Sequence, residues 1–164
     1  MRVDSKTVQG RRKLKFSSFD EVIADAEMLA SSPETRTIGN WPLDRLLTHL
    51  ATAINGSIDG LDFKVPWFAR LMGPFIKRLM MKQGWPPGFN LPKDREAGAY
   101  PGGFTPHEAV DKLRAAVART KHEKMTARHP VFGALTHEEW TKLHLYHAAM
   151  HLSFAVPPPV TGTD

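Results

Sequence analysis

The chain has 164 residues, of which 41% are hydrophobic and 24% charged, an ordinary balance for one globular domain with its own core. It contains no cysteine, which excludes disulfides, thiolate zinc sites and a cysteine nucleophile, so any bound metal needs histidine, carboxylate or water ligands. The formal net charge of +5 comes from scattered basic residues outside any nucleic-acid-binding motif, so no nucleic-acid partner is predicted.

The chain is predicted to be a cytoplasmic single domain. No apolar run approaches the roughly 18 residues needed to span a bilayer, so no integral membrane segment is predicted. Arg11-Arg12 is not followed by an apolar stretch, which argues against a twin-arginine export signal. Residues 1–16 are predicted to be a basic N-terminal arm, residues 17–156 the domain, and residues 157–164 a disordered tail.

Two helix signals open the domain. Ser18–Glu21 has the pattern of a capping box in front of an apolar periodicity, which predicts a helix over 18–31. Trp41-Pro42 precedes a second apolar stripe that continues toward Asp59-Gly60, and this predicts the second helix.

Residues 64–104 are predicted to be an insertion between the second and third principal helices. Apolar pairs recur every four residues from Trp67 to Met80 with basic residues between them, which predicts an amphipathic helix over 64–83 that is interrupted or kinked at Gly73-Pro74. This helix is predicted to pack on its own domain or on a second copy in a homodimer; a membrane surface or a protein partner is the alternative. Gly84–Phe104, rich in proline and glycine, is predicted to be a long loop that covers a pocket or is mobile.

Two further capping boxes predict the remaining helices. Thr105–Glu108 opens a helix that ends near residues 121–124, and Thr136–Glu139 opens one that continues to about Ala155. No strand-like alternation of any length is found along the chain. The fold is therefore predicted to be all-α, a bundle of four principal helices with one additional helix inserted between the second and third.

Three histidines are candidate metal ligands. His147 and His151 stand four residues apart and share one face of the last helix, which is otherwise apolar. His49 lies within the apolar stripe of the second helix and can meet them across the interior of a bundle. His144, one turn earlier, is a candidate outer-sphere residue or general base, with an exposed rim position as the alternative. All of these rings could instead be satisfied by carbonyl groups and water.

The order of these motifs resembles the DinB-like superfamily of four-helix bundles, in which a helix opened by Trp-Pro and bearing one histidine precedes a helix with His-x-x-x-His. The resemblance covers roughly residues 10–156. Shorter motifs that resemble an uncharacterised branch of this superfamily are Gly39–Pro42, Lys64–Trp67, Gly73-Pro74, Pro86–Phe89, His129–Gly133 and His144-x-x-His147. The resemblance implies a divalent metal ion, zinc or nickel, bound by His49, His147 and His151.

The resemblance also implies a class of chemistry. Some members of the superfamily are transferases or isomerases that act with a low-molecular-weight thiol such as bacillithiol, mycothiol or glutathione, and others have no known activity. We therefore predict a metal-dependent transferase or hydrolase for a small-molecule substrate, working in a pocket between the second and fourth helices. The alternative is a non-catalytic, small-molecule-binding or structural bundle. The insertion over 64–104 differs from the thiol transferases and leaves the substrate open.

Overall fold

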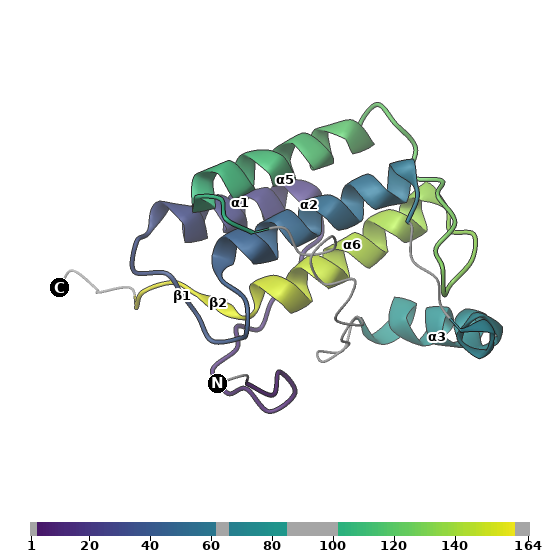
Figure 1. Ribbon diagram of the computed structural model, residues 1–164, viewed down its shortest axis with the longest axis horizontal. Helices are drawn as coiled ribbons and strands as arrows, with labels where there is room; N and C mark the ends of the chain where they lie inside the picture. The colour runs from purple at the N-terminus through teal and green to yellow at the C-terminus, as the bar shows by residue number, and fades with distance from the viewer. Residues whose placement is uncertain (1–2, 62–65, 85–101, 160–164) are drawn as a thin grey trace.

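The computed structural model describes residues 3–61, 66–84 and 102–159, and within them the chain is mostly helical, as predicted. The helices are α1 (Phe19–Ser31), α2 (Leu43–Asp59), α3 (Trp67–Gln83), α5 (Pro106–Thr120) and α6 (His137–Leu152). Two short strands accompany them in Figure 1, β1 (Arg36–Thr37) and β2 (Ala155–Val156). Most of the predicted loop (residues 85–101) and the end of the predicted tail (residues 160–164) lie outside the described residues.

Capping boxes start α5 and α6 where the sequence predicts them. The backbone N–H of Glu108 donates to Thr105 Oγ1 at 3.3 Å, and the N–H of Thr105 donates to the Glu108 carboxylate at 2.8 Å. Thr136 and Glu139 repeat this exchange at 3.1 and 3.0 Å. Each such cap stabilises a helix by about 1 kcal/mol. The local sequence therefore fixes where α6, the helix that carries two candidate ligands, begins.

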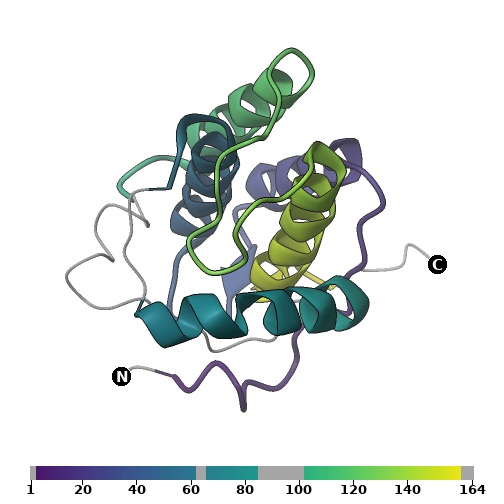
Figure 2. The ribbon, with the colours of Figure 1, turned by 90° about the vertical axis from the view of Figure 1, so that its right-hand side faces the viewer.

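Helices α1, α2, α5 and α6 pack side by side around one apolar interior, and we call this unit the helical core (Figures 1 and 2). Each helix contributes a leucine with no exposed surface: Leu29, Leu47, Leu113 and Leu152. Fully burying one leucine side chain contributes about 1.5–3 kcal/mol. Because α2 and α6 both belong to this unit, their inward faces are held at a fixed separation.

The C-terminal end of α6 differs from the prediction. The helix ends at Leu152 rather than at about Ala155, and the next residues pair antiparallel with β1 in the register Arg36↔Val156 and Thr37↔Ala155. The expectation of no strand was therefore wrong here, because two-residue strands are too short to show an alternation. The strand pair ties the end of α6 to the segment between α1 and α2.

The N-terminal arm also binds the end of α6. The Arg12 guanidinium donates to both carboxylate oxygens of Asp25, at 2.7 and 2.8 Å, and to the carbonyl oxygen of Leu152 at 3.0 Å. Arg11 donates to Ser153 Oγ at 2.7 Å, and the backbone N–H of Arg12 donates to the Ser153 carbonyl at 3.0 Å. Cationic side chains at a helix C-terminus are favourable because the last carbonyl groups carry a partial negative charge.

Helix α3 lies outside the helical core and contacts α6 along one side (Figure 2). Pro74 lies inside the helix, and Figure 1 shows its two halves running in different directions, as Gly73-Pro74 predicts. An ion pair of 2.7 Å between Lys77 and Glu139 and the buried side chain of Met80 hold it in place. The prediction that α3 packs on its own domain is confirmed for this side of the helix.

Gly73 is expected to be intolerant of any side chain. It is buried, and a Cβ built there would overlap the backbone carbonyl oxygen of Val131, which cannot rotate away. Gly73→Ala should therefore lower the free energy of unfolding by about 1–3 kcal/mol, measured by urea denaturation. Gly56→Ala is the matched control, because its Cβ would meet only the flexible end of the Leu61 side chain. Equal unfolding midpoints for the two variants would contradict this packing of α3.

Candidate metal centre

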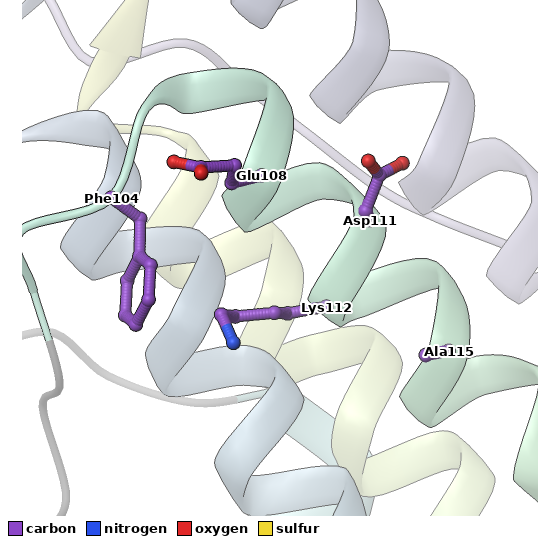
Figure 3. A pocket seen from close by; sticks show the side chains of 5 residues that line it. All are labelled: Phe104, Glu108, Asp111, Lys112 and Ala115. Carbon is purple, nitrogen blue, oxygen red and sulfur yellow. The ribbon is translucent and has the colours of Figure 1, made fainter.

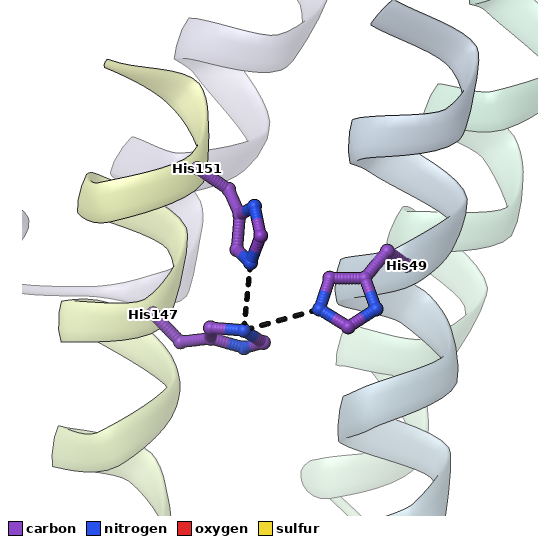
Figure 4. A group of neighbouring side chains, drawn as sticks. All are labelled: His49, His147 and His151. Carbon is purple, nitrogen blue, oxygen red and sulfur yellow. Dashed lines mark hydrogen bonds between the residues drawn. The ribbon is translucent and has the colours of Figure 1, made fainter. Parts of the chain in front are cut away.

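The three predicted ligands converge between α2 and α6 (Figure 4). The Nε2 atom of His147 lies 3.1 Å from Nε2 of His49 and 2.9 Å from Nε2 of His151. One potential ligand atom from each ring lies within 4.8 Å of the other two. His49 and His147 are 98 positions apart in the chain, and the prediction that the folded chain brings these rings together is confirmed.

These separations fit a shared cation. Nitrogen atoms bound tetrahedrally to one zinc ion at about 2.05 Å lie about 3.3 Å from one another, close to the two nitrogen separations of 3.1 and 2.9 Å. A single ion can accept the lone pairs of all three rings at once. The group of His49, His147 and His151 could therefore hold a metal ion.

The two candidate ligands on α6 are held in the neutral form that binds metals. Burial lowers the pKa of His147 well below its ordinary value of 6.5, and positive charge on His151 or His49 would lower it further. Burial likewise lowers the pKa of His151, assisted by His49 and by the charge of Arg11. Metal binding to these two rings therefore needs no loss of a proton near neutral pH.

Trp41 forms one wall of the centre. Its ring stacks on His151 with centroids 5.3 Å apart and an interplanar angle of 10°, and it meets His49 edge-on at 5.4 Å. These contacts restrict the orientation of both imidazoles and shield them from water. From the sequence, Trp41 is predicted only to open the second helix and to form part of the resemblance, and it is not singled out as a site residue. It lies before the first residue of α2, so helical periodicity cannot place its ring.

His144 lies apart from the convergent group. Its side chain is 5% exposed and stacks on Trp140 at 5.4 Å, so the exposed rim position considered from the sequence is wrong. Its Nε2 atom is buried with no hydrogen-bond partner in the described part of the chain. Burial lowers the pKa of His144 to about 3, which makes it a weak proton acceptor near neutral pH. Its role as a base or an outer-sphere residue stays a prediction.

His129 is also buried, and sequence reasoning did not single it out as a site residue. Its Nδ1 atom accepts the backbone N–H groups of Val131 and Phe132, both at 3.1 Å, so the ring hydrogen is on Nε2. The backbones of His129 and Gly133 exchange hydrogen bonds of 2.8 and 2.9 Å, which closes the turn before α6. Burial lowers the pKa of His129 to about 4. The available signal is the sequence His129-Pro-Val-Phe-Gly133, which predicts a turn and is one of the motifs of the resemblance, but does not by itself indicate a buried ring.

A solvent-open hollow of about 390 Å³ lies elsewhere, along α5 (Figure 3). It is lined by Phe104, Glu108, Asp111, Lys112 and Ala115. None of the three convergent histidines lines it. The hollow is therefore separate from the centre.

The fold and the site together place this chain in a class of proteins that are mostly helical and have three convergent histidines that could hold a metal ion. The chain belongs to the family described as "Protein of unknown function (DUF1569)", whose model matches residues 8–158. No curated protein and no solved structure matched the chain. The matched range includes both helices of the centre, and the family description assigns no activity to them.

Proposed function

We propose that this chain is a metal-dependent enzyme that binds one divalent ion, zinc or nickel, through His49, His147 and His151. The convergence of three imidazole nitrogens within 4.8 Å of one another supports this proposal more than any other observation. Three protein ligands on a tetrahedral ion leave one position for water or substrate, as in catalytic rather than structural sites. When bound, such an ion lowers the pKa of a coordinated water or thiol and supplies a nucleophile at neutral pH.

The reaction we propose is S-transfer with a low-molecular-weight thiol or hydrolysis of a small-molecule substrate. The resemblance of the Trp41-Pro42, His49 and His147-x-x-x-His151 pattern to the DinB-like superfamily supports this choice. The chain's own contributions are the neutral His147 and His151, which provide lone pairs, and the Trp41 ring, which orients His49 and His151.

The test combines metal analysis with a spectroscopic probe for thiols. Untagged protein should contain close to one equivalent of zinc or nickel per chain by elemental analysis. The apo protein loaded with Co²⁺ should show a sulfur-to-cobalt charge-transfer band on addition of glutathione, mycothiol or bacillithiol if the open position accepts a thiolate. A metal-bound protein without this band with any thiol would favour hydrolysis, and a protein that binds no divalent ion would refute the proposal.

A non-catalytic helical module is the second candidate. His147 Nε2 lies within hydrogen-bond distance of both other rings, at 3.1 and 2.9 Å, so suitable tautomers let it form a hydrogen bond with one of them without an ion, and water can pair with the nitrogen of the other. Such a protein would purify free of metal and show no change in thermal stability on addition of Zn²⁺, Ni²⁺ or Co²⁺.

A further inference from the structure

Helix α3 presents an apolar surface to solvent. Five large apolar side chains are between 45% and 76% exposed: Trp67, Leu71, Met72, Phe75 and Leu79. They share one side of the helix, because Trp67, Leu71, Phe75 and Leu79 follow one another at intervals of four residues. Exposed apolar clusters of this kind mark sites of interaction. We call this group the α3 apolar face.

The opposite side of α3 is fixed to the rest of the protein. Gly73 and Met80 are buried there, and Lys77 pairs with Glu139 at the start of α6. The packed side therefore determines which side of the helix points outward. In Figure 1, α3 lies at the lower right of the molecule, below the helical core. The α3 apolar face therefore points away from the helical core.

The charged side chains of α3 itself all have one sign. Residues 67–83 include no aspartate or glutamate. Arg78 and Lys82 are exposed at the C-terminal half of the helix, and neither pairs with a carboxylate in the described part of the chain. The whole chain has a net charge of +5. A partner that covers the α3 apolar face therefore needs an apolar layer bordered by negative charge.

We propose that α3 docks on the surface of an anionic lipid bilayer. Leu71, Phe75 and Leu79 would enter the boundary between headgroups and acyl chains, while Arg78 and Lys82 would contact the anionic headgroups. Within the described residues no helix has the length and apolarity to cross a membrane, so this contact is peripheral. A second copy fits less well, because two like-charged helices would face each other. This proposal does not depend on the metal centre.

The test is co-sedimentation of the full-length, metal-free protein with large unilamellar vesicles. Vesicles with equal parts phosphatidylcholine and phosphatidylglycerol should bind the wild type, and pure phosphatidylcholine vesicles should bind it at least tenfold more weakly. Each basic residue close to an anionic surface strengthens binding about fivefold, so Arg78→Gln with Lys82→Gln should weaken it roughly 20- to 30-fold. Phe75→Asp should abolish sedimentation, and its exposed position leaves the unfolding midpoint unchanged.

Met28→Asp is the matched control, since Met28 is also an exposed apolar residue, 40% exposed, but lies on α1. It should bind anionic vesicles like the wild type. Equal binding of the wild type to both vesicle types would overturn the proposal, and so would equal losses for Phe75→Asp and Met28→Asp. Sedimentation velocity tests whether a second copy of the chain covers the face instead. If the wild type is a dimer that does not bind vesicles, and Phe75→Asp dissociates this dimer, the face is an interface between two copies and the proposal is overturned.

Discussion

Replacing His151 with alanine is expected to weaken zinc binding by more than 100-fold. The ring supplies one of only three convergent nitrogens, and the loss of even an outer-sphere partner typically weakens metal binding 10- to 100-fold. His49→Ala should weaken zinc binding to a similar extent, because His49 supplies another of the three nitrogens, from α2. Competition with a chelating dye measures the affinity, and circular dichroism checks that helicity is preserved.

His122→Ala is the matched control for this series, because His122 is exposed, follows α5 and takes no part in the convergent group. It should bind zinc as the wild type does. Zinc present at 1,000 times its dissociation constant should also stabilise the wild type by about 4 kcal/mol, and His151→Ala much less. Equal zinc affinity in the wild type, His151→Ala and His49→Ala would show that the three rings are not metal ligands.

Mild acid is expected to destabilise the metal-free protein strongly. Burial lowers the pKa of His129 to about 4 and that of His144 to about 3, whereas both rings titrate near 6.5 when the chain is unfolded. Below about pH 6.5 the unfolded chain binds protons that the native state does not. The free energy of unfolding therefore falls as the pH falls, until the pH reaches the native pKa values. From about pH 7.5 to 5.5 each ring should lower the free energy of unfolding by about 1.3 kcal/mol.

Together these two rings predict a loss of about 2.5 kcal/mol, and His147 and His151 add to it in the same direction because their pKa values are also lowered. Urea denaturation at a series of pH values, with a chelator present, measures the slope. His144→Phe keeps an aromatic ring beside Trp140 and removes the unpaired nitrogen. At the acid end of this pH range it should lower the number of protons bound on unfolding by about one. A stability that stays constant between pH 7.5 and 5.5 would mean that these histidines are solvated.

The parts of the fold that could be predicted depend on short-range signals. The starts of α5 and α6 follow from threonine and glutamate three positions apart, because a capping box involves only one helical turn. The shared direction of His147 and His151 follows from helical geometry alone. The meeting of α6 with His49 follows from the apolar stripe around it, since an inward face of one helix must meet inward faces of others.

The parts that could not be predicted depend on contacts between distant segments. The β1–β2 pair involves four residues separated by more than a hundred positions, with no periodicity to indicate it. The Trp41 ring reaches the centre from outside a helix, where no repeat fixes its direction. His144 is buried because the aromatic rings of Trp140 and Phe19 lie beside it, and Phe19 comes from the far end of the chain.

The contacts at the end of α6 make the centre dependent on the first dozen residues. Arg11 and Arg12 bind the carbonyl and hydroxyl groups of residues 150–153, directly beside the candidate ligand His151. A proteolytic cut that releases this arm would leave the end of α6 held by the β1–β2 pair alone, and the last turn, which carries His151, would be less firmly fixed. Limited digestion should therefore reduce metal retention before it unfolds the helices. The N-terminal arm would then stabilise a site whose candidate ligands all come from later parts of the chain.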